Sequence, residues 1–327
     1  MLMANKYTSI GGQALIEGIM MKSTEKTAIA VRTPDKSIDI SYMNGKSVRE
    51  KYKILALPIV RGVVGFVESM LQGYKALSIS ADKSGFADEE ASEPKTEEQK
   101  KKDSRFVNIV MVIGAVLGVV LALGLFMYLP RLCVSGIELL IGGEITSKLL
   151  RSVIEQALKM TIFVGYVMLV SLMKDIKRVY MYHGAEHKTI FCYEKGLDLT
   201  VENVRKQKRF HPRCGTSFMI LMILISIILS IVLQFTFKGI YDNALVWTLA
   251  KVLMVPLTCG IGFEVLKICG KYDNFITRII SAPGLWLQRV TTKEPEDDMI
   301  EIAIAALKAC EPEVPDVDRT GCCNDNI

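Results

Sequence analysis

The sequence predicts an α-helical integral membrane protein, built as a four-helix transmembrane bundle with a small cytoplasmic α/β region. Half of the 327 residues are hydrophobic and the mean hydropathy is +0.30, which is high for a soluble chain. The apolar residues gather in four runs, each long enough for a helix that crosses a bilayer. The basic residues gather in alternate connections between these runs, as expected of a chain that threads a membrane.

Residues 1–80 form the predicted cytoplasmic α/β segment. Residues 27–32 and 37–42 read as two short strands, and residues 33–36 between them have the composition of a hairpin turn. Upstream, residues 10–18 form a glycine-punctuated segment, which we expect to be a loop leading into a short strand or helix.

Residues 54–80 are apolar but carry Arg61, Glu68 and Lys75, together with a proline and several glycines. Such a segment makes a poor spanning helix, so we predict an amphipathic helix that lies on the membrane or against the bundle. A buried helix of a soluble core is the alternative. Residues 81–105 mix acidic and basic side chains with almost no apolar ones, which predicts a disordered linker.

The membrane domain, residues 106–270, contains four predicted spans: residues 106–129, 153–173, 216–237 and 244–263. Pro130 should end the first span, and Pro256 should kink the fourth. Glu155 and Lys159 are four residues apart near the start of the second span, so we expect them to pair in the headgroup layer. Lys251 lies near the start of the fourth span and is expected to reach the interface.

The distribution of basic residues predicts the orientation of the chain. The connection between the second and third spans, residues 174–215, holds ten lysines and arginines, whereas the other two connections hold three and one. Basic connections remain in the cytoplasm. We therefore predict a multi-pass protein of the cell membrane with both termini cytoplasmic and membrane lipid around it. The net charge of +5 is modest, and no nucleic-acid partner is expected.

Residues 271–310 are predicted to form cytoplasmic amphipathic helices. Thr292 has the character of a helix cap, because a proline and three acidic residues follow it. An apolar face then recurs at helical spacing: Met299, Ile300, Ile302, Ala303, Ala306 and Leu307. Residues 311–327 are rich in proline and acidic residues and are predicted to be a disordered tail. The eight cysteines form no disulfide-like framework, so reduced thiols are expected.

The candidate site is predicted from the three histidines of the chain, which all lie between residues 183 and 211. In a helix, His183 and His187 share one face with Glu186. This spacing, H-x-x-E-H, is the reversed zincin pattern, in which the histidines bind zinc and the glutamate acts as a base. The helix reaches this site if it continues through Gly184, and Gly196 could end it.

A zinc-like divalent metal needs three or four ligands. We predict His183, His187 and His211, with Cys214 as the fourth, because both segments lie at the same end of adjacent spans. Glu264 and Glu17 are carboxylate alternatives. With three protein ligands the site would keep an open position for catalysis, and with four it would be structural.

Two other interpretations of these residues remain open. Cys214 precedes a predicted helix start and lies three residues from His211, so the two could form a thiol nucleophile and its base. Histidines at an interface can also simply bind lipid phosphate or cap helices, and H-x-x-E-H is a short motif that occurs by chance.

Four motifs in order give the chain a family resemblance: residues 11–21, 182–188, 211–217 and 283–288. They read GGQALIEGIMM, YHGAEHK, HPRCGTS and PGLWLQ. The chain resembles the YqhQ-like family of bacterial membrane proteins from about residue 8 to residue 310. That family is described as predicted metal-dependent enzymes, so the resemblance implies a metal site at His183, Glu186, His187, His211 and Cys214. It implies no substrate. The pitrilysin-type peptidases share only H-x-x-E-H with this chain.

Three functional hypotheses follow. The first is a metal-dependent hydrolase at the cytoplasmic face of the membrane, with Glu186 as the catalytic base and a protein or peptide as substrate. The second is a non-enzymatic membrane scaffold or transport-associated protein, in which a metal or histidine network only fixes the loop. The third, that the bundle moves an ion, is disfavoured because the spans hold few ionisable groups.

Overall fold

The computed structural model of the chain describes residues 8, 10–43, 47–85, 113–114, 116–237, 239, 243–272 and 274–311. Two compact units are present. Unit 1 comprises Met1–Glu90, Val170–Met222 and Pro256–Ile327, and unit 2 comprises Ala91–Leu169 and Ile223–Val255. Residues 312–327 of the predicted tail and most of the predicted linker lie outside the described residues.

Unit 1 is built on an antiparallel sheet of four strands in the order β1-β2-β3-β4. The strands are β1 (Gly11–Leu15), β2 (Gly18–Lys22), β3 (Thr27–Arg32) and β4 (Ile38–Met43). The predicted hairpin is confirmed as β3 and β4. The glycine-punctuated segment is a second hairpin, which the sequence reasoning missed because its turn contains Glu17 at a φ of 49°, a conformation that glycine usually supplies.

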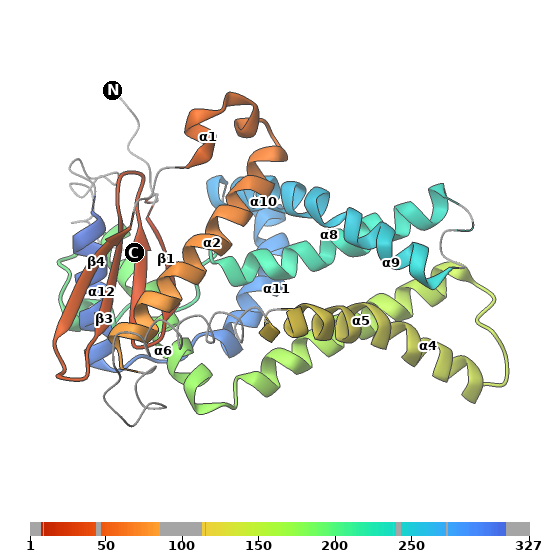
Figure 1. Cartoon of the computed structure of the whole chain (residues 1–327), viewed down its shortest axis with the longest axis horizontal. Helices are drawn as coiled ribbons and strands as arrows, with labels where there is room; N and C mark the ends of the chain where they lie inside the picture. Colours follow the sequence, from red (N-terminus) through yellow and green to blue (C-terminus); the bar gives the residue numbers. More distant parts are fainter. Residues whose placement is uncertain are drawn as a thin grey trace, which may run out of the picture. The chain divides into compact units, whose positions relative to one another are not determined.

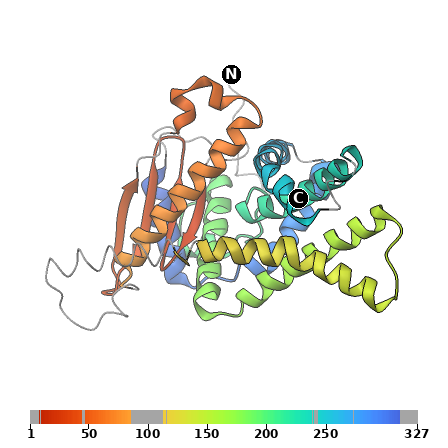
Figure 2. The same cartoon turned by 45° about the vertical axis from the view of Figure 1, so that its right-hand side comes forward.

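Helices cover both faces of this sheet (Figures 1 and 2). Helices α6 (Lys174–Glu194) and α12 (Asp297–Cys310) pack on one face, where alternate residues of β2 and β3, such as Ile19 and Ala30, are fully buried. Helix α2 (Val60–Lys83) covers the opposite face, where Ile29 meets Ala76. Because both faces are covered, β2 and β3 are continuously apolar and do not alternate.

Residues 54–80 combine the two predicted alternatives. After a short 3₁₀ helix (η1, Lys53–Ala56), the inner side of α2 packs on the sheet as a core helix would. Its outer side exposes large apolar residues, among them Met70 and Leu71, as an amphipathic helix would. Near its start, Gly62 lies against Phe263 of α10 (Val255–Lys271). The helix continues to Lys83, so the predicted linker begins later than residue 81.

In the described part of the chain, four helices are long and apolar enough to cross a membrane: Val116–Leu140, Leu149–Val170, Gly215–Thr236 and Leu245–Cys269. Pro130 does not end the first, which corrects the prediction. A π-helical turn (η2, Gly124–Tyr128) precedes the proline, and α4 (Leu129–Leu140) carries the helix onward. Such a wider turn accommodates a residue that cannot donate to the preceding turn. The fourth helix is interrupted as predicted, between α9 (Ala244–Leu253) and α10.

Two helix boundaries near the histidines also differ from prediction. The second span, α5 (Lys148–Val170), does not run into the histidine motif: Met173 has extended backbone, and α6 starts afresh at Lys174. Thr292 caps no helix start. It follows α11 (Phe275–Thr291), and its hydroxyl donates to the carbonyl of Gln288. The predicted apolar face of α12 is confirmed, since all six of its residues are fully buried. Short helices α1 (Val48–Lys51) and α7 (Val201–Arg205) complete unit 1.

Candidate metal centre

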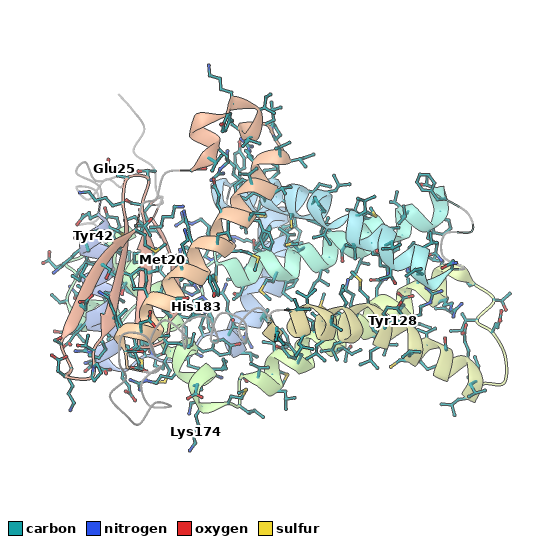
Figure 3. The ribbon with its side chains drawn as sticks, in the orientation of Figure 1. Met20, Glu25, Tyr42, Tyr128, Lys174 and His183 are labelled. Atoms are coloured by element: carbon teal, nitrogen blue, oxygen red, sulfur yellow. The ribbon has the colours of Figure 1, made fainter. Side chains whose placement is uncertain are left out.

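Helix α6 carries His183 (Figure 3) and His187, and it continues through Gly184 to Glu194. Gly196, with a φ of 67°, follows just beyond the end of the helix, near the predicted position. His183 Nδ1 lies 2.8 Å from the carbonyl oxygen of Thr291, and His187 Nδ1 lies 2.5 Å from that of Arg209. A carbonyl only accepts hydrogen bonds, so each Nδ1 must carry the proton. Each Nε2 then presents a lone pair, which is how metal-binding histidines are commonly oriented.

Cys214 completes a group of three ligands. Its Sγ lies 3.1 Å from Nε2 of His183, just before the first residue of α8 (Gly215–Thr236). One ligand atom from each of His183, His187 and Cys214 lies within 4.8 Å of the others. In a tetrahedral zinc site with bonds of about 2.0–2.3 Å, ligand atoms are about 3.3–3.8 Å apart. The group therefore needs only a small contraction to enclose one ion.

Burial and charge favour the protonation states that bind metal. His187 is almost fully buried, and its Nε2 has no hydrogen-bond partner of good geometry among the described residues. This burial lowers the pKa of His187, which favours the neutral ring. Burial opposes ionisation of Cys214, but a charged His187 ring and the hydrogen bonds of Thr216 outweigh it and lower the pKa of the thiol. When His187 is neutral, a cation bound between the ligands would supply the positive charge that favours the thiolate. A neutral imidazole and a thiolate are the forms that coordinate zinc.

Glu186 lies beside the three ligands without belonging to their group. Its carboxyl group is buried, accepts a hydrogen bond from the Gly12 amide, and keeps Oε2 without a partner in the described part of the chain. Burial raises the pKa of Glu186 to about 8. A Cβ atom at Gly12 would come within 2.9 Å of this side chain, so the glycine of β1 makes room for the acid. The arrangement allows Glu186 to take up and release a proton near neutral pH.

Gly184 allows the connection between α11 and α12 to cross α6. A Cβ atom at this position would lie 2.0 Å from the carbonyl oxygen of Lys293. The close approach is held by the Lys293 amide, which donates to Tyr180 at 2.8 Å. Thr291 is the last residue of α11 and directly precedes this connection, so the glycine in the motif indirectly brings the Thr291 carbonyl to His183.

His211 lies next to the three ligands, but its nitrogens face elsewhere. Its ring centroid is 5.5 Å from that of His187. Nδ1 accepts the Arg213 amide at 3.3 Å, and Nε2 faces Glu194 at 3.8 Å. Three of the four predicted ligands therefore converge, and the fourth forms a neighbouring network with Arg213 and Glu194.

The two carboxylate alternatives lie outside the ligand group. Glu17 does fold back onto α6, where it accepts from Arg178 at 2.6 Å and from the Tyr182 hydroxyl at 3.1 Å. Glu264 accepts from Arg61 of α2 at 2.6 Å. Each of these carboxylates therefore forms an ion pair with an arginine and is not directed at the three ligands. The alternative in which Cys214 is a nucleophile paired with His211 also needs correction. The imidazole in contact with Cys214 is that of His183.

Comparison with known proteins supports the resemblance. Residues 57–313 match the family described as "Protein of unknown function (DUF1385)". The uncharacterized protein YqhQ of Bacillus subtilis (strain 168) is 32% identical over 300 residues, which cover 90% of this chain and 89% of that protein. The chain belongs to the DUF1385 family. No solved structure matches it.

In this DUF1385 chain, one residue of the site was missed by sequence reasoning. Gln288 of α11 is fully buried, accepts the His211 amide at 2.7 Å, and donates to the His211 carbonyl at 2.7 Å and to the Ser217 hydroxyl at 2.9 Å. It thereby fixes both ends of the segment that carries Cys214. The sequence did contain a signal, because Gln288 is a polar amide on the apolar side of an amphipathic helix. It lies in the motif at residues 283–288, to which the sequence analysis gave no role in the site.

A cavity adjoins the ligand group. Its volume is about 290 Å³, and His211 forms part of its wall together with apolar side chains such as Phe191 and Leu285 and the charged Arg213 and Arg278. Because the ring of His211 also neighbours His187, the cavity is close to the three ligands. Its lining combines apolar surface with a few polar groups, as small-ligand sites do.

Proposed function

We propose that this protein is a metal-dependent hydrolase whose divalent ion, zinc in this proposal, is held by His183, His187 and Cys214. One observation carries the proposal. Two imidazoles have their Nδ1 protons fixed by backbone carbonyls, and the lone pair of at least His183 is directed at a buried thiol. A merely structural histidine would not require a second deprotonated ring and a thiol at the same point.

The residues around the ligands fit hydrolytic chemistry. Three protein ligands leave one coordination position open, and a bound zinc ion would supply Lewis acidity there. In this proposal Glu186 would accept a proton from an attacking water and return it to the leaving group. A cation held by the neighbouring ligands would favour its carboxylate form, against the effect of burial. The cavity beside His211 would hold part of the substrate.

The proposed location is the cytoplasmic face of the cell membrane, with both termini in the cytoplasm and the four candidate spans in lipid. The ten basic residues between the second and third spans support this orientation. A protein or peptide is the proposed substrate class, because H-x-x-E-H occurs in peptidases.

Elemental analysis of the detergent-purified protein tests the proposal. We expect one equivalent of zinc in the wild type, its loss in His187→Ala and in Cys214→Ser, and its retention in Glu186→Gln. His211→Ala is the matched control, because His211 is a buried neighbour that belongs to another network, and it should keep the metal. Loss of metal from His211→Ala alone, or none in the wild type, would contradict the ligand assignment.

A second candidate function is thiol catalysis by Cys214, favoured by its 3.1 Å contact with His183 at the start of a long helix. Helix starts and neighbouring imidazoles activate thiols. In this case the purified protein would contain no metal, iodoacetamide would modify Cys214 rapidly, and His183→Ala, which removes the imidazole in contact with the thiol, would slow that reaction. A third outcome would indicate a scaffold with a structural metal. In that case Glu186→Gln would keep full cellular function, and His187→Ala would unfold.

A further inference from the structure

The helices of unit 2 carry buried and half-buried polar residues in stripes that the proposed hydrolase does not use. Along α5, α8 and α9 these residues recur every three or four positions, so each set lies on one side of its helix. They are Ser152, Glu155, Gln156 and Lys159 on α5, Ser226, Ser230 and Gln234 on α8, and Trp247 and Lys251 on α9. Ionisable residues inside membrane spans commonly mark ion or substrate pathways.

Direct contacts join the three stripes at their charged residues. Lys251 Nζ lies 2.9 Å from Glu155 Oε1, and the two side chains are only 9% and 3% exposed. Lys159 Nζ donates to the Ser226 hydroxyl at 3.3 Å. Lys251 also lies 4.8 Å from the ring centroid of Trp247. The sequence had suggested instead that Glu155 pairs with Lys159 at the headgroups and that Lys251 extends to the interface.

Two residues of this cluster lie at the middle of their candidate spans, whereas Glu155 and Lys251 lie nearer the starts of theirs. Lys159 falls halfway along Leu149–Val170, and Ser226 falls halfway along Gly215–Thr236. Among the residues of the cluster that the structure describes, two ammonium groups share one carboxylate, and Glu155 pairs with Lys251, so Lys159 has no carboxylate of its own in a region of low dielectric. The Ser226 hydroxyl supplies only a dipole. Such a site attracts a monovalent anion and repels a cation.

The stripes also extend from this centre toward one end of the bundle. Consecutive spans that cross a membrane run in opposite directions, so Ser152 and Gln234 lie on the same side of the Lys159–Ser226 contact. Ser152 Oγ and Gln156 Oε1 are buried without a hydrogen-bond partner among the residues that the structure describes. These groups would give a hydrated anion a polar route to the centre.

From this geometry we infer that unit 2 contains a binding site for a small monovalent anion of halide size, between Lys159 at the middle of its candidate span and Lys251 nearer the start of its own. The site is separate from the metal centre, which belongs to unit 1. It does not depend on the proposed hydrolase activity. The site would also be compatible with ion movement through the bundle. Glu155, Lys159 and Lys251 make contacts between helices and do not extend to the membrane interface.

Iodide quenching of Trp247 fluorescence tests the inference. The chain has two tryptophans, so Trp286→Phe leaves the buried Trp247 as the reporter. In the full-length protein in detergent, iodide is titrated against gluconate at constant ionic strength. We expect saturable quenching, because the anion would sit beside Lys251 and hence near the indole.

Three variants in the Trp286→Phe background decide the outcome. Lys159→Met should weaken iodide binding at least tenfold, whereas Lys174→Met, an exposed lysine at the start of α6, should leave it unchanged. Glu155→Gln should tighten binding, because it removes the competing negative charge, and this reversed sign keeps the test valid if Lys159→Met fails to fold. Linear quenching in the parent protein, unchanged saturation in a folded Lys159→Met protein, or weaker binding in Glu155→Gln would each overturn the inference.

Discussion

Replacement of Gly184 by alanine tests whether the backbone crossing over α6 sets the metal centre. Two effects oppose each other. Alanine at a helix interior gains about 1 kcal/mol over glycine from propensity. The added Cβ would lie 2.0 Å from the Lys293 carbonyl oxygen, where a normal contact needs more than 3 Å, so the backbone of the connection must move by about 1 Å.

The displacement should break two hydrogen bonds, from Lys293 to Tyr180 and from His183 to Thr291, each 2.8 Å long. Each contributes about 1 kcal/mol, and overpacking costs a further ~1–3 kcal/mol. The losses exceed the propensity gain, so we expect a net destabilisation of about 2–4 kcal/mol. With His183 released from its carbonyl, zinc affinity should also fall about 10–100-fold.

Thermal unfolding and competition with a zinc chelator measure the two effects of Gly184→Ala. Gly165→Ala on α5 is the matched control, because a Cβ atom there meets nothing within 4 Å and the residue is outside unit 1. The control should bind zinc as the wild type does. Wild-type stability together with wild-type zinc affinity in Gly184→Ala would refute the reasoning.

Three further predictions concern the same centre. Gln288→Leu removes three buried hydrogen bonds, so we expect the unfolding free energy to fall by about 3 kcal/mol and the zinc affinity to fall about 10–100-fold. The control is Arg289→Gln at the exposed neighbouring residue, which should change neither quantity. Equal behaviour of the two variants would contradict the positioning role of Gln288. Chelation of the metal should speed alkylation of Cys214, followed by peptide mass spectrometry, whereas protection that survives chelation would show that burial alone shields the thiol. Glu17→Gln weakens the contact with Arg178 and should destabilise the fold by about 1–3 kcal/mol while zinc stoichiometry stays at one; loss of zinc would restore Glu17 as a ligand.

The main elements of the fold could be read from the sequence wherever the signal was local. Three of the four spans, the β3–β4 hairpin and the buried face of α12 follow from hydropathy and periodicity, which depend on neighbouring residues alone. The failures came where a distant contact or an unusual backbone decided the outcome. Pro130 continues a helix through a π-helical turn, and Glu17 takes a turn position that glycine would normally occupy.

For the site, the sequence identified the residue types and the tertiary structure decided their roles. His183, Glu186 and His187 share a helix face because of their spacing, and the concentration of histidines between residues 183 and 211 marked the region. Whether each imidazole can bind a metal depends on which nitrogen carries the proton. That choice is made by carbonyl groups of Thr291 and Arg209, far from the motif in sequence.

The same division holds for His211 and for the charges in the spans. Composition alone treats all three histidines alike, but Glu194 and Arg213 turn the nitrogens of His211 away from the ligand group. Sequence spacing predicts an ion pair between Glu155 and Lys159, but in the packed helices Glu155 forms its ion pair with Lys251. The sequence by itself determined which segments are apolar and which side chains share a helix face, because both properties are local. The tertiary structure decided which polar atoms meet, because a hydrogen bond or a coordination bond requires placement to within about 0.5 Å, and only packing between distant segments provides it.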